Sequence, residues 1–231
     1  MSGAPGPPIF YLIPGLGADE RVFRRWHLLG EAHVLRWLPP QSADEPLSHY
    51  AARLAAAVPL AQDCWVVGVS FGGPLALEIA QLRPRARAVL VSSLAGPHEL
   101  PFSLRLARAT GLHRLVLPSL LQRLPRLVGW AFGVTTRSEH ALLRQIVLDT
   151  DPVFARWAIR QLLCWQGVAG PGPAARLHGT RDRLLPAPVV GIDCRIAGAG
   201  HFMVVSHAAQ ISEFLNQLAA THQPTEYSAG H

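Results

Sequence analysis

The chain has 231 residues, of which 49% are hydrophobic and 16% charged, and its 21 basic residues, all of them arginine, outnumber the 15 acidic residues. This composition excludes a disordered chain, and no apolar run reaches the roughly 18–20 residues that a membrane span requires. The net charge of +6 is weak support for nucleic-acid binding, because no nucleic-acid-binding motif accompanies it. We therefore expect one domain, or one domain with a sizeable insertion, that binds no nucleic acid.

The cysteines and the first residues bear on cellular location. Cys64, Cys164 and Cys194 are too few and too scattered for a disulfide framework or a cysteine-based zinc site, which fits a reducing compartment. The first residues contain no basic leader and only a short apolar run before Pro14, which is less than a secretory signal needs. The sequence thus predicts a cytoplasmic protein, and it leaves the oligomeric state open.

Short apolar runs alternate with helical patterns along the chain, as is typical of parallel sheets joined by crossover helices. The predicted strands are Ile9–Ile13, His33–Leu38, Cys64–Val69, Ala86–Val91, Ala174–His178 and Gly191–Ile196. The predicted helices are 19–29, Leu47–Val58, Phe71–Leu82 and about Ser206 to Ala219, and the polar tail from Thr221 is expected to be disordered.

One long segment interrupts this alternation. From Pro97 to about Gly167 the chain has no convincing strand, only leucine- and arginine-rich helical patterns. We therefore predict an α/β core domain formed by residues 1–96 and 168–231, with its sheet mostly parallel and flanked by helices. An all-helical insertion, residues 97–167, would interrupt this domain.

The first motif with chemical meaning is G-x-S-x-G around Ser70, between a predicted strand and a predicted helix. Such a turn holds the serine hydroxyl exposed above the sheet edge, and its glycines let strand and helix approach closely. The motif alone is weak, since a tight turn that merely contains serine would match it. The strand before it and the helix after it favour a nucleophile.

Two further residues follow predicted strands. Asp182 ends the run HGTRD, where its carboxylate could orient an imidazole, although a solvated turn residue is the alternative. Asp193 is the nearby rival acid, but it lies inside or at the start of a strand. His201, in GAGHFM, is placed to act as a general base. We expect His178 to pack under the acid loop and His207 to lie on the surface of the last helix.

The turn after the first predicted strand, Pro14-Gly15-Leu16-Gly17, should face the serine. An acyl-transfer site needs two donors for the oxyanion of its tetrahedral intermediate. We assign these donors to the backbone amides of Leu16 and Phe71, and we expect Gly15 to contact substrate. Phosphate binding by this loop is poorly supported, since neither the dinucleotide motif nor a P-loop lysine is present.

With the motifs PGLGAD, GVSFGG, HGTRD and GAGHFM, and with the order Ser70, Asp182, His201, the chain resembles the α/β-hydrolase superfamily over residues 9–219. The position of Pro14 is usually histidine in that family, so the chain departs from the pattern there. The resemblance implies a sheet of about six strands, because the chain begins at what the family counts as its third strand. It excludes haloalkane dehalogenases, whose nucleophile is aspartate.

The resemblance and the chemistry together imply hydrolysis of a carboxylic ester or thioester through an acyl-enzyme on Ser70, without metal or other cofactor. Two alternatives remain open at this stage. One is lyase or synthase chemistry with the same serine and histidine, as in some relatives. The other is a binding or signalling protein that retains the fold.

In this superfamily the helical insertion would be a lid over the active site. Possible lining residues are Phe102, Trp130, Phe154, Trp157 and Trp165, although the last two could instead fill the core of the lid. The insertion holds nine arginines and four acidic residues. Its basic face suggests docking of an acidic acyl carrier or an anionic membrane, with Arg105, Arg108 and Arg123 to be tested, whereas arginines on merely solvated faces are the simpler interpretation.

Overall fold

The computed structural model describes residues 6–111, 123–170 and 172–221. It contains one six-stranded sheet in the order β2-β1-β3-β4-β5-β6, with every neighbouring pair parallel. The strands are β1 (Ile9–Ile13), β2 (Glu31–Val34), β3 (Cys64–Val69), β4 (Ala86–Val91), β5 (Ala175–Gly179) and β6 (Cys194–Ile196). The predicted α/β class and a parallel sheet of about six strands are therefore confirmed.

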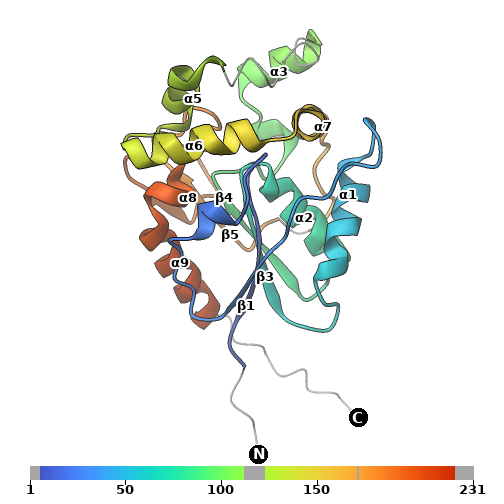
Figure 1. Cartoon of the computed structure of the whole chain (residues 1–231). Helices are drawn as coiled ribbons and strands as arrows, with labels where there is room; N and C mark the ends of the chain where they lie inside the picture. Colours follow the sequence, from blue (N-terminus) through green and yellow to red (C-terminus); the bar gives the residue numbers. More distant parts are fainter. Residues whose placement is uncertain (1–5, 112–122, 171, 222–231) are drawn as a thin grey trace, which may run out of the picture.

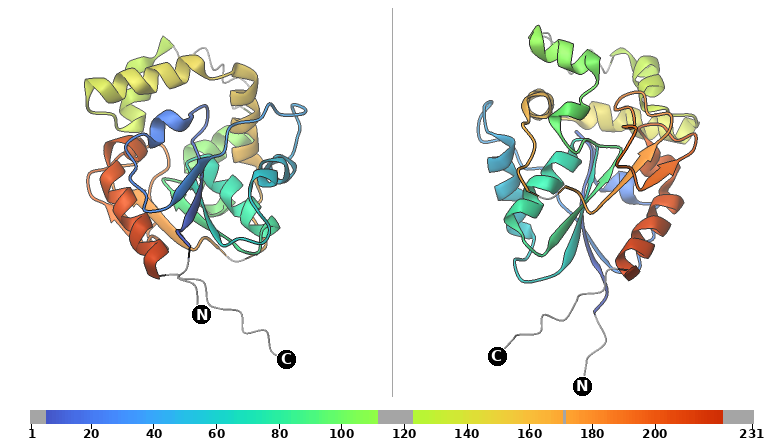
Figure 2. Two further views of the ribbon diagram at one scale, coloured as in Figure 1. Left: turned by 60° about the horizontal axis from the view of Figure 1, so that its bottom comes forward. Right: turned by 180° about the vertical axis from the view of Figure 1, so that it is seen from behind.

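Helices cover both faces of this sheet (Figures 1 and 2). α1 (Leu47–Leu54), its 3-10 extension η2 (Ala55–Ala57) and α2 (Gly72–Leu82) pack on one face, while η1 (Glu20–Phe23), α8 (Met203–Ser206) and α9 (Ala208–Thr221) cover the other. In β1 the side chains alternate between the two faces: Ile9 and Tyr11 belong to one buried cluster, Phe10 and Leu12 to the other. Burial on both sides explains why the central strands are apolar throughout.

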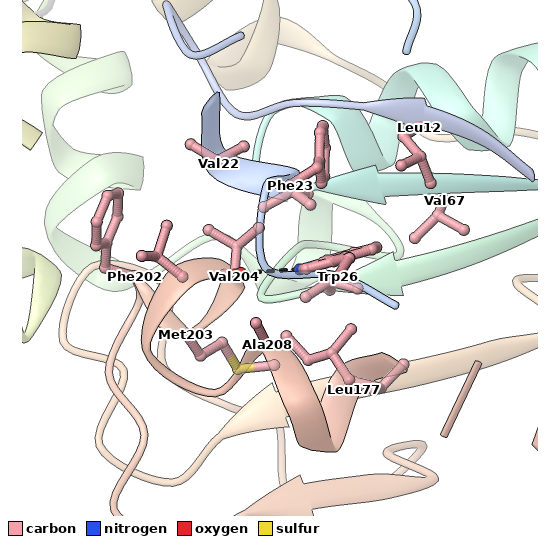
Figure 3. Close-up of a cluster of buried hydrophobic side chains, with 14 of the residues drawn as sticks. Leu12, Val22, Phe23, Trp26, Val67, Leu177, Phe202, Met203, Val204 and Ala208 are labelled. Carbon is pink, nitrogen blue, oxygen red and sulfur yellow. Dashed lines mark hydrogen bonds between the residues drawn. The ribbon is translucent and has the colours of Figure 1, made fainter. Parts of the chain in front are cut away.

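The prediction of a helix over 19–29 is wrong, because only the four residues of η1 are helical. Val22, Phe23 and Trp26 are nevertheless buried and pack against α8 and α9 (Figure 3), whereas Leu29, which the same spacing placed beside them, is 76% exposed. The indole Nε1 of Trp26 donates a hydrogen bond of 2.8 Å to the carbonyl oxygen of Val204, as Figure 3 shows. A compact turn can thus bury side chains whose spacing predicts one face of a longer helix.

The second strand and the last helix also differ from their predicted bounds. β2 is an exposed edge strand that ends at Val34, whereas the apolar run from His33 suggested a strand that continues to Leu38. There the hydroxyl of Tyr50 bonds the amide and the carbonyl of Leu38, each at 2.8 Å, and so holds this run against α1. The last helical segment is split at His207 into α8 and α9.

The segment between β4 and β5 is helical where it is described, as predicted. It comprises η3 (Pro97–Glu99), α3 (Phe102–Ala109), α5 (Pro125–Phe132), α6 (Arg137–Asp149) and α7 (Pro152–Cys164). These helices lie over the carboxyl ends of the strands (Figure 1). Residues 112–122 of the predicted insertion and the predicted tail beyond Thr221 fall outside the described residues.

The insertion is fixed to the sheet by shared packing and by a buried ion pair. Val128 and Leu143 join the cluster under α9, whereas Trp157 joins the cluster formed with α1 and α2. Arg176 of β5 makes two hydrogen bonds, of 2.8 and 2.6 Å, to the carboxylate of Glu99 in η3. Both side chains are about nine-tenths buried. None of the described helices combines the length and hydropathy needed to cross a bilayer.

Candidate active site

Ser70 occupies the sharp turn between β3 and α2. Its backbone adopts the left-handed conformation, with φ of 52°, which few non-glycine residues adopt and which is a sign of local strain. The neighbouring glycines are sterically required: a Cβ on Gly68 would lie 2.2 Å from the carbonyl oxygen of Gly72, and one on Gly72 would lie 2.5 Å from that of Ile13. The G-x-S-x-G pattern therefore forms the tight strand-to-helix turn that the sequence suggested.

His201 lies on the loop between β6 and α8 and connects Ser70 to Asp182. Its Nε2 lies 2.9 Å from the Ser70 hydroxyl oxygen, and its Nδ1 lies 2.8 Å from a carboxylate oxygen of Asp182. An ionised carboxylate can only accept hydrogen bonds, so Nδ1 carries a proton and donates a hydrogen bond to Asp182. In the neutral imidazole Nε2 is then free to accept the proton of the Ser70 hydroxyl.

Asp182 is held by its own loop. One carboxylate oxygen accepts hydrogen bonds from the backbone amides of Leu184, at 3.0 Å, and Leu185, at 2.9 Å. Burial raises the pKa of the carboxyl, but hydrogen bonds from His178 and His201 lower it, and the net pKa lies well below the usual aspartate range. Asp182 is therefore an anion at neutral pH, which suits an oriented and stabilised imidazole.

His178, the penultimate residue of β5, packs beneath this acid loop, as predicted. Its Nε2 lies 2.7 Å from the carbonyl oxygen of Leu185 and 3.4 Å from the Asp182 oxygen that His201 also contacts. Both neighbours are acceptors, so Nε2 must carry the proton. The hydrogen bond to Leu185 fixes the acid loop, and this supporting role could not be inferred from the sequence.

The rival residues point elsewhere. The Asp193 carboxylate accepts a hydrogen bond of 2.8 Å from the backbone amide of Arg176, beside the start of β6. His207 is hydrogen-bonded through Nδ1 to the hydroxyl of Ser206, at 2.8 Å. Of the acids and histidines weighed from the sequence, Asp182 and His201 are those brought together with Ser70.

The loop after β1 passes beside the serine. A Cβ built on Gly15 would lie 3.5 Å from the Cβ of Ser70, and β1 and β3 are neighbours in the sheet. In the described part of the chain, the backbone amides of Leu16 and Phe71 donate to no protein acceptor. Both amides are thus available to an oxyanion, and the proline at position 14 leaves the Leu16 amide in place.

A cavity of about 610 Å³ adjoins this loop. Its walls come from the loop after β1, the stretch after β2 and the junction of α6 and α7, and they include Pro14, Gly17, Trp37 and Phe154. The rings of Trp37 and Phe154 lie 5.7 and 6.4 Å from the ring of Phe71, the residue after the serine. The cavity thus adjoins the loop after β1, and two of its aromatic side chains pack against the residue that follows Ser70.

The aromatic residues proposed from the sequence as pocket lining have different positions. Phe154 lines the cavity. Trp157 and Trp165 are buried in the core, where their indole nitrogens donate to the carbonyl oxygen of Glu45 and to the carboxylate of Glu78. Phe102 and Trp130 are exposed, and the Arg183 guanidinium lies over the Trp130 ring, 4.8 Å from its centroid. Trp37 was missed because the apolar run to Leu38 suggested a strand.

The insertion also touches the histidine loop directly. The Phe132 ring packs edge-to-face on the His201 imidazole, with centroids 5.3 Å apart, and its carbonyl oxygen accepts a 2.9 Å hydrogen bond from Phe202. Gly133 ends α5 in the left-handed conformation, and a Cβ there would come within 2.8 Å of Gly200. No sequence motif indicated this contact, because it joins segments far apart in the chain.

Within the described residues, no group of three or more His, Cys, Asp or Glu side chains is arranged to hold a metal ion. The site as it stands offers a hydroxyl, an imidazole, a carboxylate and two free amides. This set can perform nucleophilic attack on a carbonyl carbon with proton transfer through the imidazole.

Neither a protein-family model nor a curated protein matches the chain. Among solved structures, an esterase from Thermogutta terrifontis is similar with a TM-score of 0.72 and 18% identity, covering 96% of this chain and 92% of the esterase. A bacterial membrane phospholipase A gives 0.64 and 22%, covering 92% and 79%. A bromoperoxidase from Bacillus anthracis gives 0.68 and 16%, covering 94% and 93%. The chain therefore has the α/β-hydrolase fold, as the sequence resemblance implied.

Proposed function

We propose that the protein is a serine hydrolase that cleaves a carboxylic ester or thioester through an acyl-enzyme on Ser70. The observation that carries this proposal is the continuous hydrogen-bonded series from the Ser70 hydroxyl through His201 to Asp182, at 2.9 and 2.8 Å, beside two free backbone amides. Solved structures of the same fold named as esterases are consistent with a hydrolase.

Acylation follows from the geometry. His201 Nε2 takes the hydroxyl proton while the Ser70 oxygen attacks the carbonyl carbon, and the amides of Leu16 and Phe71 stabilise the resulting oxyanion. His201 then gives the proton to the leaving alcohol or thiol. Asp182 remains ionised and stabilises the imidazolium through its bond to Nδ1.

Deacylation repeats these steps with water. His201 removes a proton from the water molecule, the hydroxide oxygen attacks the acyl carbon, and the proton returns to Ser70 as the acid leaves. All proton transfers use groups of this chain, so the proposal involves no cofactor. We also propose that residues 97–167 act as a lid on the core formed by residues 1–96 and 168–231.

The cavity beside Phe71 indicates the kind of substrate. Its aromatic side chains, Trp37 and Phe154, favour an apolar or aromatic group on the ester, whereas the exposed Phe102 and Trp130 do not line it. We therefore propose a small-molecule ester or thioester with an apolar group, and we assign lining of the cavity to Trp37 and Phe154.

The test is hydrolysis of p-nitrophenyl esters from acetate to laurate by the wild type, by Ser70→Ala and by the control Ser103→Ala, which removes an exposed hydroxyl of α3. We expect kcat/KM to fall by about 10⁴-fold or more in Ser70→Ala and to stay unchanged in Ser103→Ala. Burst kinetics and a mass increase equal to the acyl group on Ser70 should accompany turnover.

Two outcomes would replace the proposal. Turnover of a substrate without a covalent intermediate on Ser70 would indicate lyase or synthase chemistry with the same residues. Tight ligand binding by a folded but inactive wild type, preserved in Ser70→Ala, would indicate a binding protein.

A further inference from the structure

α3 turns Leu104 toward a small core cluster, but it also exposes two large apolar side chains. None of its residues is buried, and Phe102 and Leu106, one turn apart, are 71% and 51% exposed. Amphipathic helices of globular proteins bury this stripe against the core. Arg105 and Arg108 lie on the same short helix and are exposed beside it.

The start of α5 has the same character. Leu127 and Trp130 are 57% and 59% exposed, although Val128 between them is buried in the core. Exposed arginines accompany these side chains at positions 123 and 126. We call the exposed apolar and arginine side chains of these two segments the outer surface: Phe102, Arg105, Leu106, Arg108, Arg123, Leu124, Arg126, Leu127 and Trp130.

Charge on the outer surface has one sign. No acidic residue occurs in the sequence between Pro101 and Ser138, which contains six arginines. Among the described residues, the four arginines of the outer surface form no ion pair. These cations are therefore available to an anionic partner.

Both helices lie at one end of the molecule. In Figure 1 and in the rear view of Figure 2, α3 and α5 are at the end opposite the start of β1 and the end of α9, beyond the carboxyl ends of the strands. The outer surface is thus on the side of the sheet that carries Ser70, and contact through it would bring that side toward the partner.

We propose that the outer surface docks on a membrane that contains anionic lipids. Arginines bind lipid phosphates, while phenylalanine, leucine and tryptophan side chains enter the boundary between headgroups and acyl chains. A second copy of this chain fits less well, since a symmetric contact would bring like-charged arginines together. An acidic soluble protein would need apolar patches shaped to both helices, whereas a fluid bilayer accepts apolar side chains on two separate helices without a matched shape.

This proposal goes beyond ester hydrolysis and holds whether or not Ser70 is a nucleophile. The experiment is sedimentation with vesicles of phosphatidylcholine alone and of phosphatidylcholine mixed with phosphatidylglycerol. We expect binding to the mixed vesicles to be at least about tenfold tighter and to weaken as salt is added.

Paired variants separate the two contributions. Arg105→Gln/Arg108→Gln should weaken binding to the mixed vesicles by about tenfold at low salt. Phe102→Ser/Leu106→Ser should weaken it at low and high salt alike. Matched controls are Arg24→Gln/Arg25→Gln, which removes two exposed arginines beside η1, and Leu29→Ser/Leu60→Ser, which removes exposed leucines outside the insertion. Unchanged thermal unfolding midpoints verify the fold of every variant.

Four results would overturn the proposal. The first is equal binding to both kinds of vesicle, or none to either. The second is an equal loss in a control pair. The third is a concentration-dependent dimer that Phe102→Ser/Leu106→Ser abolishes, which would point to a second copy of the chain. A fourth is binding to vesicles and to soluble polyglutamate that stays equally strong in Phe102→Ser/Leu106→Ser, which would point to an acidic protein.

Discussion

The site around Ser70 and the outer surface of the insertion place polar and apolar groups in opposite ways. At the site, Asp182 and His201 are buried, and both ring nitrogens of His201 have a partner at hydrogen-bond distance, on Asp182 and on Ser70. On the outer surface, Phe102 and Trp130 are more than half exposed. A buried charge is tolerated only with partners, whereas exposed apolar side chains in a group are typical of contact surfaces. Substitutions at the site should therefore abolish activity, whereas substitutions on the outer surface should leave activity and folding stability nearly unchanged.

The largest expected effect is that of Asp182→Asn. The amides of Leu184 and Leu185 donate to one carboxylate oxygen, so they would hold the asparagine oxygen and turn its NH2 group toward His201 Nδ1. That arrangement favours the wrong imidazole tautomer, and the neutral amide supplies no charge to an imidazolium. We expect kcat for a p-nitrophenyl ester to fall by about 10⁴-fold with KM nearly unchanged. Loss of less than tenfold would show that Asp182 does not orient His201.

The second prediction concerns the buried ion pair between Arg176 of β5 and Glu99 of η3, which fixes the insertion to the sheet. Glu99→Gln leaves the Arg176 guanidinium, whose Nε already has no hydrogen-bond partner, buried without a counter-charge. We expect the free energy of unfolding, measured in urea, to fall by about 3–5 kcal/mol. The double variant Arg176→Met/Glu99→Leu should recover much of this loss. If the double variant is less stable than Glu99→Gln, the pair contributes more than the avoidance of a lone charge.

Much of the sheet and the positions of Ser70, Asp182 and His201 could be predicted, because they depend on local patterns. Apolar runs mark strands, glycines mark the turn at Ser70, and parallel strands bring their carboxyl ends to one edge. The lining of the cavity depends instead on packing between distant segments. Trp37 meets Phe154 at 5.0 Å across more than half the chain, and no periodicity records such a contact.

Burial of the tryptophans shows the same limit. Trp157 and Trp165 have the spacing and size of either core or pocket residues, and only the neighbouring α1 and α2 decide between these roles. Helical spacing over 19–29 likewise identified Val22, Phe23 and Trp26 as buried, but it wrongly grouped the exposed Leu29 with them and predicted the wrong backbone conformation. The sequence pattern thus predicts which side chains are buried better than it predicts which residues they contact.

The third prediction tests support of the acid by His178. His178→Phe keeps an aromatic ring but removes the donor to Leu185 and Asp182. Because the native pKa of Asp182 lies below its unfolded value, its stabilisation is complete above the ordinary aspartate range and is lost as pH falls through the native pKa. Without His178 that pKa should rise, so the acid midpoint of unfolding should move to higher pH.

The same substitution should lower the free energy of unfolding at neutral pH by about 1.5–3 kcal/mol, a range typical of hydrogen bonds to charged groups. His178→Gln, which retains an N–H donor, is the matched variant and should recover part of both effects. An acid midpoint that is unchanged in His178→Phe would leave Asp182 supported by its loop amides and His201 alone.

The smallest effect is expected from Leu127→Ser on the outer surface. The side chain is 57% exposed, so its loss should change the free energy of unfolding by no more than about 0.5 kcal/mol and leave kcat for a soluble ester unchanged. Val128→Ser, at the next and buried position of α5, is the contrast, since it places a hydroxyl in the cluster shared with the sheet. That change should cost about 1–3 kcal/mol. Equal losses from both variants, measured in urea, would mean that Leu127 is covered by packing in solution and that the outer surface is not free to meet a membrane.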